Sequence, residues 1–168
     1  MLTERERTGA LGSWGEVKAI ALLVRSGFSN VRDMNASAVN YPFGDIYAER
    51  TGVRYLIGVK TRNKYQVSGQ LNPCYNIRKK GADVLAIANR HNARLAWVAN
   101  QVIPERQLVW SYFGTISLIE DRGERFSIPL RASDTSKYEC LAEEEEDVSI
   151  RQEWSNGGYD RSRERPLL

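Results

Sequence analysis

The sequence is poor in the residues that build several common kinds of site. It contains one histidine and two cysteines in 168 residues, and Cys74 and Cys140 lie far apart without metal-ligand spacing. A histidine-based catalytic triad and a histidine-rich metal site are therefore disfavoured, and His91, in "NRHNAR", is expected to be a solvated loop residue. Two free thiols indicate a reducing compartment, so we expect the protein in the cytoplasm.

Long apolar runs and nucleotide-binding glycine motifs are also missing. No stretch approaches the about 20 apolar residues of a membrane span, and Glu16, Lys18 and Arg25 interrupt the apolar segment near the N-terminus, which disfavours a signal peptide. We therefore expect no membrane association. Without G-x-x-x-x-G-K-[ST] or G-x-G-x-x-G, nucleotide-fuelled chemistry and dinucleotide binding have no support. The remaining composition, 42% hydrophobic and 27% charged, is that of an ordinary globular domain.

The charge is unevenly distributed along the chain. Residues 1–134 carry 19 Lys and Arg against 12 Asp and Glu, whereas residues 135–168 carry 5 against 9. We expect a basic domain over residues 1–133 and an acidic, flexible tail over residues 134–168, which lacks apolar periodicity. A basic domain is compatible with a phosphate-bearing partner. The "EEEED" run is either a solvated tail or a mimic of DNA that shields the basic face.

Hydrophobic periodicity predicts a mixed α/β domain. Val17, Ile20, Ala21 and Val24 recur at helical spacing and are followed by Gly27, a natural helix stop. Short runs of alternating or continuous apolar residues predict strands, and a proline ahead of "CYNIRKK" predicts a short helix. The predicted elements are a helix over 13–27, a strand near 28–35, a hairpin of strands 43–49 and 53–61, a helix over 73–80, strands over 82–90 and 94–103, and a hairpin over 115–130.

The predicted apolar strand over residues 53–61 has a lysine, Lys60, near its end. Side chains alternate along a strand, so Lys60 shares a face with Gly58. A hairpin register could set Asp45 of the preceding strand beside Lys60. Glu16, at the border of the first helix's apolar stripe, can face the same place.

The order of elements and these residues resemble the PD-(D/E)xK nuclease superfamily, within it the archaeal Holliday-junction resolvases, from roughly Ser13 to Val98. Glu16 matches the family's first-helix glutamate, and Asp45, in "YPFGD", its strand aspartate. Gly58-Val59-Lys60 matches the carboxylate-x-Lys motif in position but lacks the carboxylate. The resemblance implies a restriction-endonuclease-like core, with a central mixed sheet flanked by helices and a C-terminal hairpin and tail.

The resemblance also implies metal-assisted hydrolysis of phosphodiester bonds in DNA, including branched or structured DNA. Asp45, Glu16 and the backbone carbonyl of Val59 would bind Mg²⁺ or Mn²⁺, since hard cations prefer oxygen ligands. Lys60 would orient or deprotonate the attacking water, or stabilise the charged phosphate. A homodimer is expected by analogy. The residues expected to hold the nucleic acid are Arg62, Lys64, Gln70, Arg78, Lys79 and Lys80.

Each of the three central residues also has a simpler structural explanation. Ser13-x-x-Glu16 fits a helix capping box, Asp45 could close a turn, and Lys60 could be an edge-strand lysine that deters sheet pairing. Because Gly58 offers no ligand, the sequence also allows a nuclease-fold protein with a decayed site, which binds nucleic acid or a protein partner without cutting. Metal binding distinguishes the two functions.

Overall fold

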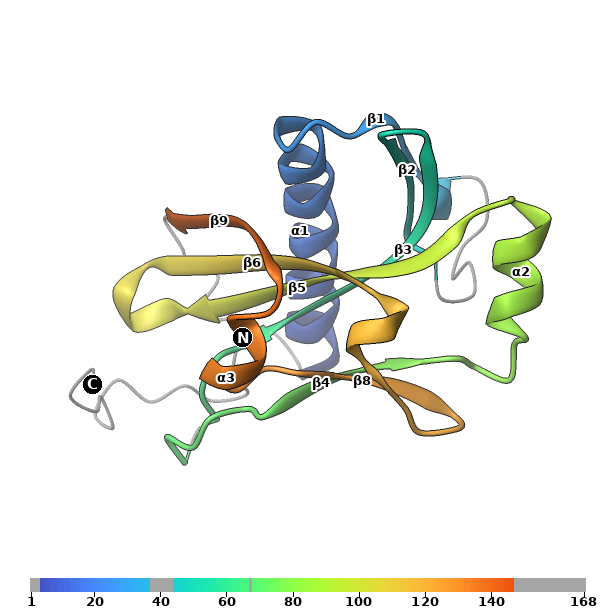
Figure 1. Cartoon of the computed structure of the whole chain (residues 1–168). Coiled ribbons are helices and arrows are strands. Elements are labelled where there is room, and N and C mark those ends of the chain that lie inside the picture. The colour runs from blue at the N-terminus through green and yellow to red at the C-terminus, as the bar shows by residue number, and fades with distance from the viewer. Residues whose placement is uncertain (1–3, 37–43, 67, 147–168) are drawn as a thin grey trace.

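The centre of the molecule is a curled mixed sheet (Figure 1). The computed structural model describes residues 4–36, 44–66 and 68–146, and within them six strands form this sheet in the order β1-β2-β3-β5-β6-β9. Strands β3 and β5 are parallel, and the other neighbours are antiparallel. The strands are β1 Ser29–Asp33, β2 Ile46–Arg50, β3 Val53–Asn63, β5 Arg94–Ile103, β6 Leu108–Thr115 and β9 Glu139–Glu145.

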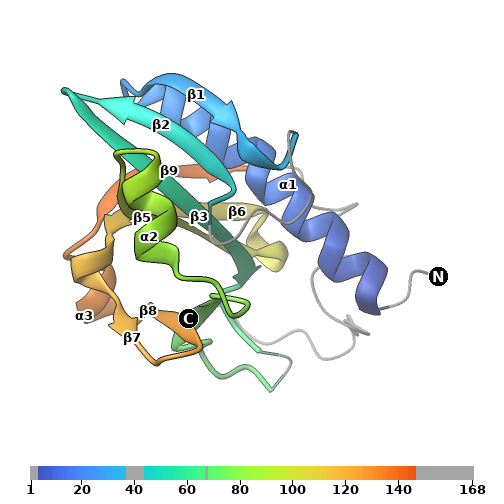
Figure 2. The same ribbon diagram turned by 90° about the vertical axis from the view of Figure 1, so that its right-hand side faces the viewer.

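Helices and a small sheet cover the two faces of the central sheet (Figure 2). The long helix α1 packs Ala19 and Leu23 onto one face. The other face is covered by α2 and by a three-stranded antiparallel sheet of order β4-β8-β7, which contribute Tyr75, Ile77 and Ile87 to a second apolar cluster. In the described part of the chain no helix combines the length and apolarity that a membrane crossing needs. The remaining elements are α1 Glu4–Arg25, η1 Met34–Ala36, β4 Cys74–Arg78, α2 Val84–Arg90, η2 Pro104–Arg106, η3 Ile116–Leu118, β7 Glu120–Asp121, β8 Arg125–Pro129 and α3 Ala132–Thr135.

Helix α1 approaches the sheet closely at Gly15. A Cβ atom at this position would overlap the hydroxyl of Thr61 on β3. The buried amide of Asn100 on β5 donates to the Gly15 carbonyl oxygen at 3.2 Å and to Thr61 Oγ1 at 3.1 Å, and Ser111 on β6 donates to Asn100 Oδ1 at 2.7 Å. Because all three polar side chains are buried, these hydrogen bonds fix where α1 lies on the sheet.

The acidic segment supplies the last strand of the sheet. Lys18 on α1 is 8% exposed, and its Nζ contacts Glu144 Oε2 at 3.0 Å and Glu146 Oε1 at 2.6 Å. At the other end of β9, Arg50 makes a two-pronged contact with Glu139. The expectation of a flexible tail is therefore wrong for residues 134–146, because basic residues of α1 and β2 neutralise the strand. Residues 147–168 lie outside the described residues.

Two neighbouring elements were predicted in the wrong class. Residues 73–80, predicted as a helix, contain strand β4 instead, because Tyr75 and Ile77 are buried at alternating positions and follow a strand period. Residues 82–90, predicted as a strand, contain helix α2. Its buried residues Val84, Ile87 and Ala88 follow a helical period, and Asp83 caps it by accepting from the Ala86 amide at 3.1 Å.

The other predicted elements are present with shifted ends. Strand β1, the β2–β3 hairpin and β5 lie where expected. The predicted hairpin over 115–130 is present only in part, because η3 occupies residues 116–118 and β7 is only Glu120–Asp121. Helix α1 begins at Glu4, well before the predicted start at residue 13, and β2 begins at Ile46 rather than residue 43. Strand β6 was not predicted, although it pairs with β5 along its whole length.

We predict that Gly15→Ala lowers the free energy of unfolding by about 2 kcal/mol, because the added methyl group forces α1 away from Thr61. Gly12→Ala is the matched control on the same helix. A Cβ atom there meets nothing within 4 Å, so alanine should raise the free energy of unfolding by up to about 1 kcal/mol through helix propensity. Urea unfolding followed by circular dichroism measures both, and equal stabilities for the two variants would contradict the close approach.

Candidate active site

Asp45 lies where β2 begins, and the backbone of β3 holds it. Its amide donates to the Ile57 carbonyl oxygen at 2.9 Å, and its Oδ2 accepts from the Val59 amide at 2.8 Å. The preceding Gly44 lies directly against the buried Leu56 side chain, where a Cβ atom would overlap it. Because glycine has no side chain, the chain can pass close to Leu56 at this position. Asp45 then lies beside the backbone of β3. Residues 41–43 of "YPFGD" lie outside the described residues.

An asparagine joins Asp45 to Glu16. The Asn35 Nδ2 atom donates to Asp45 Oδ1 at 3.0 Å and lies 3.4 Å from Glu16 Oε2. Asn35 belongs to the short helix η1, and its backbone amide donates to Asp33 Oδ1 at 2.9 Å. Two carboxylates from distant parts of the chain are thus held around one amide. Asn35 could not be identified from the sequence, because "DMN" indicates a local turn but not which residues the turn faces.

The two carboxylates retain protons unusually well. Burial, followed by the charge of Asp45, raises the pKa of Glu16 to about 7, and Asp33 adds to this effect. Burial also raises the pKa of Asp45, although its hydrogen bonds from Val59 and Asn35 oppose the shift. Concentrated negative charge of this kind favours a bound cation.

Lys60 occupies the middle of the sheet rather than its edge. Strand β3 pairs with β2 on one side and with β5 on the other, so the edge-strand explanation is wrong. Ile46 pairs with Ile57, and this register carries Asp45 toward Gly58 instead of Lys60. Burial lowers the pKa of Lys60 to about 8, helped by nearby cations, while the charge of Asp45 opposes the shift. Lys60 and Asp45 are therefore electrostatically coupled without being register partners.

The remaining structural explanations have different outcomes. Ser13 lies inside α1, nine residues after its start at Glu4, so Ser13 and Glu16 do not form a capping box. Asp45 does have a structural role, because its carboxylate accepts the Val59 amide. That role is compatible with a second one, since Oδ1 accepts from the Asn35 side chain, which also contacts Glu16.

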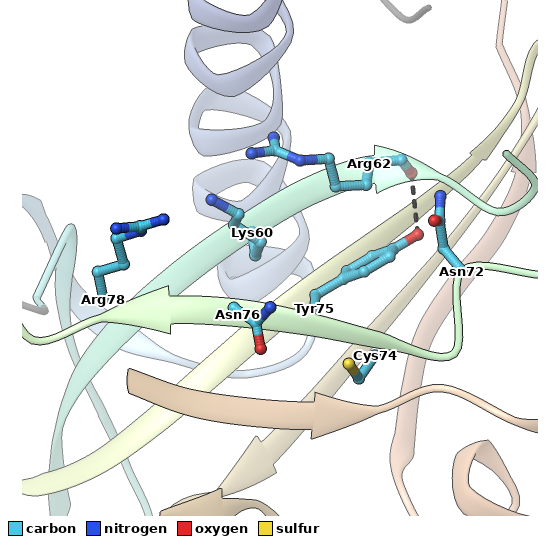
Figure 3. A pocket seen from close by; sticks show the side chains of 7 residues that line it. All are labelled: Lys60, Arg62, Asn72, Cys74, Tyr75, Asn76 and Arg78. Atoms are coloured by element: carbon cyan, nitrogen blue, oxygen red, sulfur yellow. Dashed lines mark hydrogen bonds between the residues drawn. The ribbon is translucent and has the colours of Figure 1, made fainter. Parts of the chain in front are cut away.

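Part of the predicted nucleic-acid-binding set gathers near the site. The side chains of Arg62 and Arg78 line one cavity together with Lys60 (Figure 3). Lys80 lies close enough to Asp45 that its charge lowers the pKa of that carboxyl more than Lys60 does. The structure thus brings together cations from β3, from β4 and from the turn that follows it.

Three predicted residues lie apart from this group. Lys79 Nζ contacts Asp121 Oδ1 at 2.7 Å and lies 4.3 Å from the centre of the Phe126 ring, within the small sheet. Lys64, just beyond the end of β3, lies 3.8 Å from the centre of the Trp110 ring. Gln70 is exposed in the loop before β4.

The donor set can be tested for its fit to a divalent cation. Within the described residues no three His, Cys, Asp or Glu side chains gather closely enough to hold a metal ion. Asp45 and Glu16 provide oxygen ligands of the type that Mg²⁺ prefers. Asn35 lies at the same place, with its amide nitrogen toward both carboxylates. The described residues therefore supply two carboxylates that fit part of a magnesium-type site, without a complete ligand set.

We predict that Glu16→Gln changes how stability depends on pH. The pKa of Glu16 is about 7 in the folded protein and 4.5 in a model compound, so wild-type stability should fall as pH rises between these values. Glutamine does not titrate. Between pH 5 and pH 8 the free energy of unfolding of the variant should therefore rise by on the order of 1 kcal/mol relative to that of wild type, after allowance for solvent screening. Urea unfolding in EDTA measures this difference. The exposed Glu145→Gln should show no such change, and parallel pH curves for wild type and Glu16→Gln would contradict the prediction.

Comparisons with known proteins agree with the observed architecture. The sequence matches no family model and no curated protein. The structure is similar to that of Hjc from Archaeoglobus fulgidus, a Holliday junction resolvase from an archaeal hyperthermophile, with a TM-score of 0.50 and 17% identity. The similarity covers 75% of this chain and 96% of the resolvase. At this identity the likeness shows the fold alone. The expected restriction-endonuclease-like fold, with a mixed sheet flanked by helices, is therefore confirmed.

Proposed function

We propose that this protein is a metal-dependent nuclease that hydrolyses phosphodiester bonds in DNA. The observation that carries the proposal is the pair of carboxylates of Glu16 and Asp45, held around the Asn35 amide with Lys60 close by. The fold shared with a Holliday junction resolvase supports DNA as the substrate, including branched DNA. A homodimer remains a prediction by analogy.

The residues that would hold a metal ion come from four places in the chain: α1, η1, the start of β2 and β3. Asp45 and Glu16 would bind through carboxylate oxygens, and the Val59 carbonyl is a further ligand to be tested. Asn35, turned so that its Oδ1 faces inward, would supply the oxygen that Gly58 cannot. Bound Mg²⁺ or Mn²⁺ would neutralise charge on the phosphate and lower the pKa of a water molecule.

Lys60 would either transfer a proton during the reaction or stabilise the negative charge on the reacting phosphate. With a pKa of about 8, its amine exchanges protons near neutral pH more readily than an ordinary lysine. In its protonated form it places a positive charge in a half-buried site, where a charge interacts more strongly than in water. Either role requires the position that β3 gives it between β2 and β5.

A second function is favoured by a different observation. Gly58 supplies no side-chain ligand, and although Asp33 lies near Glu16, the described residues contain no three acidic, histidine or cysteine groups placed to hold a metal ion. A protein with this site could bind nucleic acid, or a protein partner, without cutting. Such a protein would retain affinity for DNA in the absence of affinity for metal.

We expect wild-type protein to bind Mn²⁺ in calorimetric titration and to nick supercoiled or branched DNA. Asp45→Asn should abolish both, because it removes the anionic ligand that β3 holds in place. Lys60→Ala should retain metal binding and lose about 100-fold or more in rate, the scale of a lost proton-transfer or charge-stabilising group. Lys137→Ala, an exposed lysine beyond α3, is the control expected to match wild type.

Circular dichroism of each variant confirms that the fold is intact, and sedimentation of the same samples tests the homodimer. Cleavage by Asp45→Asn at the wild-type rate would refute the assigned site. If wild type binds DNA but no metal, the non-cutting function stands in its place.

A further inference from the structure

A cavity lies between β3 and β4, on the face of the sheet opposite α1 (Figure 3). Its volume is about 250 Å³, enough for a phosphate group and part of a sugar. Three of the side chains that line it are the cations Lys60, Arg62 and Arg78, and Figure 3 shows their charged ends directed toward one another. Among the described residues, none that lines the cavity carries a carboxylate.

Within the described part of the chain, no salt bridge explains these cations as structural charges. None of the three forms one with a described acidic side chain. The Arg62 guanidinium donates to the carbonyl of the neighbouring Thr61, at 2.9 Å. Like charges held together and partly shielded from water destabilise a fold unless an anion offsets them. The arrangement therefore points to a ligand of negative charge.

The neutral groups of the cavity favour the same kind of ligand. Asn76 accepts from Ser127 through its Oδ1 at 2.6 Å, which leaves its amide nitrogen as the group to donate. The buried Tyr75 hydroxyl donates to the carbonyls of Arg62 and Asn63 at 3.0 and 3.2 Å, so it ties β4 to β3 beneath the cavity. The three cations and the Asn76 amide nitrogen are donors, as the oxygens of a phosphate require.

The position of the cavity relates it to the carboxylate pair. Lys60 lines the cavity and is also coupled to Asp45. Arg62 lies two residues farther along β3, about 7 Å away at the rise of a strand. A nucleic-acid strand running along β3 would therefore bring one phosphate to the carboxylates and a neighbouring phosphate to the cavity.

We propose that this cavity is a phosphate subsite, which holds a phosphate of the nucleic acid next to the one at the carboxylate pair. The inference rests on the proposed function for its choice of substrate, but the subsite requires neither metal nor cleavage. The phosphate is either an internal phosphodiester of a continuous strand or the terminal phosphate of a strand end. Both present the same oxygens to Lys60, Arg62 and Arg78.

The test measures binding of fluorescent single-stranded oligonucleotides in EDTA, by anisotropy at several salt concentrations. Arg78→Gln and Arg62→Gln should each weaken binding and reduce the slope of log affinity against log salt by about 0.7, the value for one phosphate contact on a single strand. Arg94→Gln, an exposed arginine at the start of β5, is the matched control and should bind as wild type does. Because Arg78 is exposed, its variant should fold even if Arg62→Gln does not.

Oligonucleotides with and without a terminal phosphate distinguish the two sources. A gain of about tenfold for a phosphorylated end, lost in Arg78→Gln, assigns the terminal phosphate, whereas equal affinities for both ends assign an internal one. Wild-type affinity and salt slope in both Arg62→Gln and Arg78→Gln would overturn the subsite. Repeating the titration with Asp45→Asn separates the two proposals, because that variant loses the metal ligand and should keep the salt slope of wild type.

Discussion

The close contact between α1 and β3 at Gly15 is the constraint on which the candidate site depends. Glu16 follows directly in the helix, so any shift of α1 on the sheet moves its carboxylate away from Asn35 and Asp45. The Asn100 amide holds this contact by bridging the helix carbonyl and the Thr61 hydroxyl inside the core. A buried side-chain amide whose hydrogen bonds are all made costs the fold little stability. A displaced helix would leave one of its buried donors unpaired, which costs more. The core thereby fixes the site more firmly than an apolar contact alone would.

The sequence indicates some residues of the candidate site but not all of their neighbours. Glu16, Asp45 and Lys60 could be proposed from the sequence because their residue types and order resemble those of a known nuclease family. Asn35 could not be found in this way, because its importance lies in where the short helix η1 places it beside two distant carboxylates. The exchange of class between β4 and α2 has a different cause, since short apolar runs fit a strand and a helix almost equally well and only burial in the tertiary structure decides.

Strand β3 also organises the charges of the molecule. Val59 binds the Asp45 carboxylate through its backbone, while the side chains of Lys60 and Arg62 lie in a cavity that no described carboxylate lines. Acidic and basic clusters therefore meet along a single strand, where their charges interact without forming a salt bridge between the described residues. A phosphodiester flanked by a bound cation and by these basic side chains would satisfy both clusters at once.

The pairing of Lys18 with Glu144 and Glu146 also bears on how the chain folds. These partners lie 126 and 128 residues apart in the sequence. Before β9 is synthesised and docks on β6, the Lys18 ammonium has no acidic partner on that strand, and burying it against the sheet is unfavourable. Helix α1 is thus expected to reach its final packing late in folding, although it precedes β9 in the chain. The site around Glu16 should therefore be complete only when folding is nearly finished.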